Sequence, residues 1–392
     1  MSAITTVFLK ETLENLRDRR VVFSAFFFGV LLAPAIFALT TTLVSKRAIK
    51  DQEQPLKFAV VGETRAPNLM RFLAEQGVAI ESTDISERDA VEKVRSGDHE
   101  LVLIVREDYA ERLAAGESAP LDLVVDTANT RAAGSTERAR RLLEGYSHQL
   151  AALRLLARGV SPSVIEPLAV RSVDVATPAG RSLLILGMLT YFCLMSMLVG
   201  GFYLAIDTTA GERERGSLEP LLTLPVTRSQ LILGKILATC AFMAVSLLLT
   251  LTAFSVALSF VPLEVLGMSA NLGPSLVLAI FAVMVAFVPL GAGLMTLVAS
   301  FTRSNREAQT WLSVVLLIPL APIMFAVMNG TRATPWLMAI PSLSQHLLAT
   351  DLIRGEVPDP LHIAISVLST LIAGALLVAL AVRLYRRESI LG

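Results

Sequence analysis

Six long apolar segments constrain this chain more than any other feature of its sequence. They cover residues 21–44, 183–206, 231–261, 275–301, 310–329 and 361–382. A helix that crosses a lipid bilayer needs about 20 mostly apolar residues, and each segment is long enough. Composition agrees, since 54% of all residues are hydrophobic and 17% are charged, against about 45–50% and about 25% in soluble domains. The sequence therefore predicts an integral membrane protein with six transmembrane helices, kinked where Pro289 and Pro319 interrupt them.

Lys and Arg are distributed unevenly between the connecting segments. They gather before the first apolar segment, between the second and third, between the fourth and fifth, and after the sixth: Lys10, Arg17, Arg19, Arg20, Arg213, Arg215, Arg228, Lys235, Arg303, Arg306, Arg383, Arg386 and Arg387. By contrast, residues 262–274 contain neither Lys nor Arg. Because basic flanks stay in the cytoplasm, we expect both termini there and residues 46–181 on the opposite side of the membrane.

Residues 46–181 are polar and have the pattern of a small α/β domain. Short β-rich runs at 56–62, 78–85, 101–105 and 121–125 alternate with helical patterns, and a longer helix is expected over 131–158. Gly77 and Gly97 are expected to end two of the helices, and Ser86 to open one. The predicted fold class is thus an α-helical membrane protein with six transmembrane helices, plus a small extracytoplasmic α/β domain inserted between helices 1 and 2.

Several functional classes lack support in the sequence. Lys and Arg total 34, as do Asp and Glu, whereas a nucleic-acid partner requires a basic surplus. The motifs HExxH and GxSxG and paired cysteines are absent, and the four His residues have no ligand spacing. Gly234-Lys235 is followed by Ile236 and has no first glycine at the P-loop spacing. The chain is therefore expected to be neither an enzyme nor a binder of ATP, metal or another cofactor.

The stretch from Asp207 to Lys235, directly after the second apolar segment, is rich in charge. Within it, Leu218, Leu221 and Leu222 share one helical face. The opposite, polar face carries Arg213, Glu214, Arg215 and Glu219. This pattern favours an interfacial helix from Glu212 to Leu222 whose charges face a soluble partner. The plainer alternative is a loop with charges that extend into solvent.

The run Glu212–Leu222, followed by Pro225, Arg228 and Leu233-Gly234-Lys235, resembles the cytoplasmic coupling segment of the ABC type-2 exporter permeases. Further features agree with that family: residues 1–20 resemble its amphipathic connecting helix, and the large domain between helices 1 and 2 is similar to the branch of sodium-export permeases typified by NatB. The resemblance implies helix 1 at 21–45, the extracytoplasmic domain at 46–181, and helices 2–6 within 182–392. It also implies a coupling loop at 207–230 and an outer, re-entrant-like segment at 330–360.

The resemblance implies that the chain is the transmembrane permease subunit of an ATP-driven ABC exporter in the inner (plasma) membrane of a bacterium. Such a subunit moves an ion, drug, peptide or lipid-like substrate outward. A separate cytoplasmic ATPase subunit binds ATP and Mg, and a second permease copy or a paralogue completes a dimer among the membrane lipids, without nucleic acid. The residues expected to couple to the ATPase are Glu212, Arg213, Glu214, Arg215, Gly216, Leu218, Glu219, Leu221 and Leu222.

Two questions stay open at the level of sequence. Thr190, Tyr191 and Ser196 are polar residues that suit a substrate path, but packing is the commoner role for such residues in transmembrane helices. The size of the domain at 46–181 also suits a non-transporting membrane sensor or scaffold, whose outer domain binds a ligand or protein.

Overall fold

The chain forms two compact units, which are described separately. The computed structural model describes residues 2–53, 56–83, 85–129, 132–164, 177, 186–217, 220, 225–261 and 272–386. The helical unit comprises Met1–Ser45 and Val175–Gly392, and the α/β unit comprises Lys46–Asp174.

Six helical stretches among the described residues are long and apolar enough to cross a membrane, which confirms the predicted number. They are Arg19–Leu43, Leu189–Glu214, Arg228–Ser259, Pro274–Phe301, Asn305–Asn329 and Pro360–Tyr385. We refer to them as spans 1 to 6. The structure is mostly helical, as expected for a protein whose backbone polar groups must be satisfied within a bilayer.

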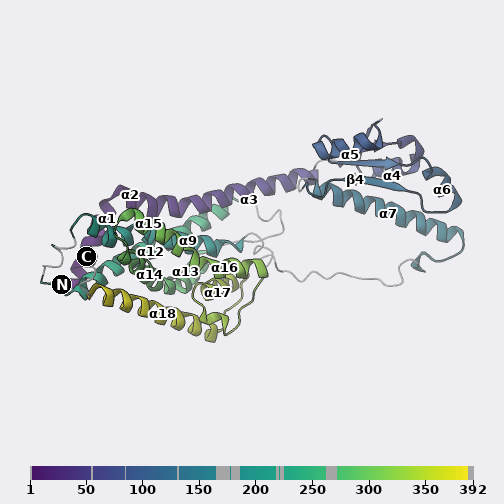
Figure 1. Ribbon diagram of the computed structural model, residues 1–392. Helices are drawn as coiled ribbons and strands as arrows, with labels where there is room; N and C mark the ends of the chain where they lie inside the picture. Colours follow the sequence, from purple (N-terminus) through teal and green to yellow (C-terminus); the bar gives the residue numbers. More distant parts are fainter. Residues whose placement is uncertain are drawn as a thin grey trace. The chain divides into compact units, whose positions relative to one another are not determined.

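Several spans are built from more than one helical element (Figure 1). Span 1 contains α2 (Arg19–Val22), the π-helix η1 (Phe23–Phe28) and part of α3 (Gly29–Glu53), after the N-terminal α1 (Ala3–Arg17). Span 2 joins α9 (Leu189–Ile206), the π-helix η4 (Asp207–Gly211) and α10 (Glu212–Glu214), and span 3 is α12 (Arg228–Ser259). Spans 4 to 6 and their connections contain α13 (Pro274–Met284), η6 (Val285–Phe287), α14 (Val288–Phe301), α15 (Asn305–Val315), α16 (Leu317–Asn329), η7 (Leu337–Ala339), α17 (Leu343–Arg354) and α18 (Pro360–Arg386).

Pro289 and Pro319 account for the two breaks in spans 4 and 5. Proline has no N–H to donate to the carbonyl four residues earlier, which here belongs to Val285 or Val315. The α-helix of span 4 gives way to a 3₁₀ turn that starts at Val285, and α15 ends at Val315. Both interruptions therefore occur where the missing hydrogen bond requires them, as the sequence predicts.

The core of the helical unit forms where α9, α12, α14 and α18 pack together. At one crossing, Gly200 of α9 leaves room for Ser246 of α12, whose hydroxyl donates to the carbonyl of Ala25 at 3.0 Å. A Cβ atom at Gly200 would lie 2.2 Å from Ser246 Oγ, which no real Cβ tolerates. This glycine thus sets the distance between spans 2 and 3 and preserves a hydrogen bond to span 1.

The α/β unit is built around a four-stranded sheet with strand order β2-β1-β3-β4. Its strands are β1 (Lys57–Val61), β2 (Ala79–Ser82), β3 (Leu101–Val105) and β4 (Leu121–Val125), and only β4 runs antiparallel to its neighbour. Its helical elements are η2 (Glu63–Arg65), α4 (Pro67–Glu75), α5 (Glu87–Ser96), α6 (Tyr109–Ala115), α7 (Ala133–Ala157) and η3 (Pro162–Val164).

Helices cover both faces of this sheet, which explains the uninterrupted apolar run of β3. Successive side chains of a strand point to opposite faces. Leu101, Leu103 and Val105 pack with residues of α4 and α7, whereas Val102 and Ile104 pack with residues of α5; Figure 1 shows α5 and α7 on opposite sides of the sheet. All five residues of β3 are buried in consequence.

The local signals in this unit act as predicted. Ser86 caps α5 by accepting the N–H of Asp89, and Gly97 follows the helix with a φ of 85°. Gly77 (φ of 76°) likewise follows α4. The segment expected to return the chain to the membrane, up to Val175, lies mostly outside the described residues.

A matched pair of glycine substitutions tests the close contact between spans 2 and 3. We expect Gly200→Ala to lower the thermal unfolding temperature of the detergent-solubilised chain, because its Cβ collides with Ser246. Gly145→Ala is the control: this glycine lies within α7 and has no other atom within 4 Å of a Cβ, so the same change should stabilise the helix by about 1 kcal/mol. Equal effects of the two substitutions would contradict the contact.

Candidate functional site

The charged segment after α9 lies where helices from distant parts of the chain meet. It begins with the π-helical turn η4, a widened turn that is frequent at functional sites. A Cβ atom at Gly211 in this turn would lie 3.0 Å from Asn305 Oδ1, so the turn packs closely against the start of α15. It is followed by α10, the start of the segment that the sequence suggested as a coupling element.

Lys235, in the second turn of α12, is the centre of this junction. The side chain is 1% exposed, and its ammonium group donates to a carboxylate oxygen of Glu212 and, at 2.8 Å, to the carbonyl of Thr208. The Glu11 carboxylate lies 3.9 Å from the same nitrogen. A buried charge of this kind is tolerated only where it is paired and hydrogen-bonded, so Lys235 fixes the end of span 2 against the start of span 3.

The N-terminal helix α1 completes the junction. Gly234 allows its close approach, since a Cβ there would lie 2.7 Å from Val7 Cβ and 3.1 Å from the carbonyl of Ile4. Glu11 is therefore held inside, 3% exposed, where it accepts a hydrogen bond from the Lys10 ammonium at 3.1 Å. Two carboxylates, Glu11 and Glu212, thus share the positive charge of Lys235.

Arg213 and Glu214 connect the same segment to spans 4 and 5. The guanidinium of Arg213 donates to the carbonyls of Thr302 and Ser300, at 2.7 and 3.0 Å. These carbonyls lie at the C-terminal end of α14, where they have no partner within the helix and where a cation is favoured. The Glu214 carboxylate accepts the N–H of Asn305 at 2.7 Å, at the N-terminal end of α15. The positive charge of Arg213 therefore lies at a C-terminal helix end and the negative charge of Glu214 at an N-terminal helix end, where each is favoured.

Gly216 ends the helix earlier than expected. Its φ is 67°, the Gly216 N–H donates to the Arg213 carbonyl, and the Ser217 N–H donates to the Glu212 carbonyl. This is the Schellman arrangement that terminates helices, so the expectation of one continuous helix from Glu212 to Leu222 is wrong. The four predicted coupling residues Leu218, Glu219, Leu221 and Leu222 lie outside the described residues, and their shared face stays a prediction.

The charged side chains of this segment differ in exposure. Glu212 is 5% exposed and Arg213 is directed toward the end of α14, so both make internal contacts, and their contact with an ATPase subunit stays a prediction. Arg215 is more accessible: its side chain is 53% exposed and pairs with Asp207 at 2.8 Å. The hydrogen bond to that carboxylate raises the pKa of Arg215.

A polar cavity of about 490 Å³ lies between α1 and the segment after α9. Five of its lining residues are acidic and two are basic, with three uncharged residues among them: Lys10, Glu11, Glu14, Asn15, Asp18, Asp207, Glu212, Arg215, Ser217 and Pro220. The acidic excess makes this cavity attractive to a positively charged group.

The residues suggested for a substrate path are distributed along span 2. Ser196 is hydrogen-bonded to Thr250 of α12 at 2.6 Å, and Tyr191 packs edge-on against Phe192. Thr190 is hydrogen-bonded to Nδ1 of His346, in α17, at 2.5 Å. Each contact is internal to the helical unit, and whether these residues also contact a substrate stays a prediction.

Gln345, the residue before His346, belongs to a separate buried polar cluster between α17 and α18. Gln345 donates to Ser366 at 3.2 Å and to Thr370 at 2.8 Å, and Ser366 donates to Ser344 at 2.9 Å. Ser342, directly before α17, has a φ of 71°, the only positive φ of a non-glycine residue in the described part of the chain. The described residues contain no group of three or more His, Cys, Asp and Glu side chains suited to a metal ion.

The sequence did not predict the buried residues at the centre of these contacts, Lys235 and Glu11 at the junction and His346 beside Thr190. The sequence placed Lys235 only among the basic flanking residues, and it did not single out Glu11 within residues 1–20. The available signal was the position of Lys235, one turn inside a long apolar segment, where an unpaired ammonium is costly. No local signal exists for His346, because its partner Thr190 is 156 residues away.

Two comparisons with known proteins agree over nearly the whole chain. The family model described as "ABC-2 family transporter protein" matches residues 24–383. The chain is also 25% identical, over 362 residues, to the ABC transporter permease protein NatB of Bacillus subtilis (strain 168), and the match covers 91% of each chain. The range matched by the family model includes the α/β unit, all or most of each of the six spans, and Glu212 and Lys235, whereas α1 with Glu11 precedes it.

Removal of the ammonium from the junction should destabilise the helical unit. In Lys235→Met, Glu212 and Glu11 remain buried without their counter-charge, and we expect a loss of about 3–5 kcal/mol in the free energy of unfolding, measured as a lower unfolding temperature in detergent. The double variant Lys235→Met/Glu212→Gln should recover part of that loss. Arg215→Met, which removes an exposed cation, is the control; if it is as damaging as Lys235→Met, the buried pair is not the cause.

Stability should also depend on pH through His346. Burial, followed by the charge of Arg354, lowers the pKa of His346 from 6.5 to about 4. The unfolded chain therefore binds the proton more readily, so the native state should lose stability as the pH falls from about 6.5 toward 4, by on the order of 3 kcal/mol in total. Unfolding temperatures measured across this range should decline less steeply in His346→Gln; an unchanged slope would contradict the assignment.

Proposed function

The chain belongs to the ABC-2 family of transporter proteins, and from this membership we propose that it is the permease of an ATP-driven exporter whose ATP is hydrolysed by a separate subunit. Its place as a transmembrane permease subunit of an ABC transporter follows from the family and from the similarity to the NatB permease. We further propose the outward direction of transport, the class of substrate and the way in which the ATPase acts.

The observation that carries this proposal is the Lys235 junction. Segment 207–217 is bonded on one side to α12 through Lys235 and on the other to α14 and α15 through Arg213 and Glu214. A displacement of this segment therefore acts directly on spans 2, 3, 4 and 5. We assign the segment, with the following residues up to 230, as the coupling loop on which the ATPase subunit acts.

The docking surface is the acidic cavity between α1 and this segment. Glu14 and Arg215 lie at the cavity with side chains 61% and 53% exposed, so both are accessible to a partner. The excess of acidic residues favours a basic side chain of the ATPase subunit, by the charge complementarity that guides protein association. Glu212 and Arg213 have a different role, because they connect the loop to the spans.

The proposed orientation has both termini and this cavity in the cytoplasm and the α/β unit outside, in the inner membrane of a bacterium. It rests on the asymmetry of Lys and Arg between the flanks. A cysteine introduced at Glu92 of α5 should react with an impermeant maleimide in intact cells, while one at Lys10 should not. The reverse pattern would refute the orientation.

For the substrate, the described spans favour an amphiphilic or hydrophobic molecule, such as a drug, peptide or lipid, over an ion. The buried carboxylates and ammonium in the described helical unit are Glu11, Glu212 and Lys235, and all three lie at the junction, whereas intramembrane charges usually line ion paths. Thr190, Tyr191 and Ser196 are the proposed polar contacts on the path. ATP-driven uptake of ²²Na⁺ into inside-out vesicles, without uptake of a fluorescent amphiphile, would reverse this preference.

Six spans with one coupling loop are half of a transporter, and we therefore expect a dimer of this chain or of this chain with a paralogue. The alternative, a membrane sensor or scaffold that does not transport, predicts no ATPase partner at all. Co-purification from native membranes separates the two, because a transporter retains a nucleotide-binding subunit and a scaffold does not.

A surface charge reversal tests the docking surface without disturbing the buried network. We expect Glu14→Lys, which reduces the acidic excess of the cavity, to weaken the co-purification of the ATPase subunit by about two- to fivefold, since a rim charge contributes about 0.2–1 kcal/mol. Substrate-stimulated ATP hydrolysis should fall in parallel, while the unfolding temperature stays near the original. Glu92→Lys makes the same charge change on α5 and is the control; unchanged ATPase binding in Glu14→Lys would refute the docking surface.

A further inference from the structure

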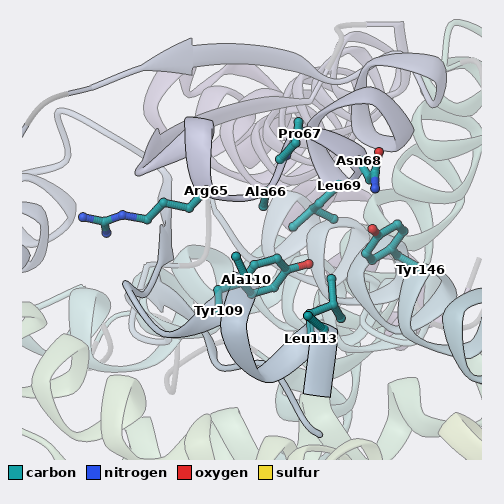
Figure 2. A pocket seen from close by; sticks show the side chains of 10 residues that line it. Arg65, Ala66, Pro67, Asn68, Leu69, Tyr109, Ala110, Leu113 and Tyr146 are labelled. Atoms are coloured by element: carbon teal, nitrogen blue, oxygen red, sulfur yellow. The ribbon is translucent and has the colours of Figure 1, made fainter. Parts of the chain in front are cut away.

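The α/β unit contains a second cavity, of about 330 Å³, between the first turn of α4, helix α6 and helix α7. Figure 2 shows its lining side chains. Its walls are mostly apolar, with Leu69 and Leu113 on two sides and the methyl groups of Ala66 and Ala110 between them. Ligand cavities of this size are typically apolar with a few polar groups that fix the orientation of the ligand.

Two tyrosine hydroxyls supply such polar groups. Tyr109 of α6 and Tyr146 of α7 are 3% and 8% exposed, and in Figure 2 their hydroxyl oxygens point toward each other across the cavity. The Tyr146 hydroxyl is buried and makes no hydrogen bond of normal geometry among the described residues, although buried polar groups in native proteins nearly always have one. The Tyr109 hydroxyl is close enough to interact with it, which, after burial, contributes to the raised pKa of Tyr109. The ring of Tyr146 is held by Phe72, at 5.1 Å between centroids, so its hydroxyl is a fixed feature.

The hydrogen-bond donors around the cavity indicate which polar group of a ligand it accepts. Burial raises the pKa of Tyr109 to about 12, so its hydroxyl remains a donor at physiological pH. Helix α4 begins at the cavity with Pro67, and no side chain caps its first turn, so the N–H groups of Asn68 and Leu69 face outward from the positive end of the helix.

No acidic side chain is among the residues that line the cavity. The guanidinium of Arg65 is directed away from it, in Figure 2, and is bonded to the Val105 carbonyl and to Glu107. Arg154 donates to the Leu113 carbonyl at 2.7 Å, behind the cavity wall. Arg65, although part of the lining, is paired with Glu107, and Arg154 is the further cation near the wall. A lining with hydrogen-bond donors and without a carboxylate favours an anionic acceptor over a cationic head group.

We propose that this cavity binds a small amphiphilic carboxylate, with its apolar body between Leu69 and Leu113 and its carboxylate accepting hydrogen bonds from Tyr146, Tyr109 and the first turn of α4. The size of the cavity corresponds to an aromatic or short-chain acid. The binding site is separate from the coupling loop and independent of the proposed transport, so it would serve a transporter or a sensor equally.

The test uses the full chain in lipid nanodiscs and ¹⁹F NMR of 4-fluorophenylacetate, a water-soluble acid of the required size. We expect saturable binding, weaker by about tenfold or more for the neutral 4-fluorophenylacetamide and for the cationic 4-fluorophenethylamine. Binding of all three probes with equal affinity, or of none, would overturn the proposal.

Substitutions locate the binding. Tyr146→Phe keeps the contact with Phe72 and removes only the hydroxyl, so it should weaken binding of the acid by about tenfold without lowering the unfolding temperature. Ala110→Phe places a ring in the cavity from the exposed side of α6 and should abolish binding. Tyr203→Phe, the same chemical change in span 2, is the control. If the acid binds Tyr146→Phe and Ala110→Phe as it binds the unchanged chain, the site lies elsewhere and the proposal fails.

Discussion

The ammonium group of Lys235 is the constraint on which the helical unit depends. An ion of this size loses several kcal/mol of hydration when it is buried, and it is stable here only because Glu212, the carbonyl of Thr208 and the more distant Glu11 surround it. Those partners come from α10, the π-helical turn η4 and α1, so a single charge determines how three parts of the chain meet. Gly234 and Gly211 matter for the same reason, because each lets a neighbouring helix approach closely enough to complete the junction.

The charged residues of segment 207–217 have different roles because some are buried and others are exposed. Glu212 and Arg213 are interior residues that connect the segment to the ends of the spans, whereas Arg215 and the neighbouring Glu14 of α1 are accessible at the acidic cavity. A partner that binds the accessible charges thus acts on a segment that is already attached to spans 3, 4 and 5. These links are charge-assisted hydrogen bonds of the Lys235, Arg213 and Glu214 side chains, and they are the physical basis of the coupling that we propose.

The sequence predicts the features that depend on length and on local chemistry. Six apolar segments give six spans, Pro289 and Pro319 break helices at the carbonyls they leave unbonded, and Ser86 and Gly97 delimit α5. The sequence does not predict the features that depend on tertiary contacts. The periodic leucines of 218–222 favoured a helix that continues through Gly216, although a glycine after a charged run is also a C-cap signal, and that signal prevailed. The pairing of Thr190 with His346, and the burial of Glu212 against Lys235, depend on segments that are brought together only in the folded chain.

The positions of Glu212 and Lys235 along the chain also bear on the order in which the protein assembles. They are 23 residues apart, so their contact closes a short loop, whereas the contact of Lys235 with Glu11 closes a loop roughly ten times longer, at an added entropic cost of about 2 kcal/mol. On a ribosome the two halves of the short loop emerge in succession, and spans 2 and 3 can pair as a hairpin before the later spans exist. Helix α1, although synthesised first, can then join a hairpin whose pairing does not depend on it.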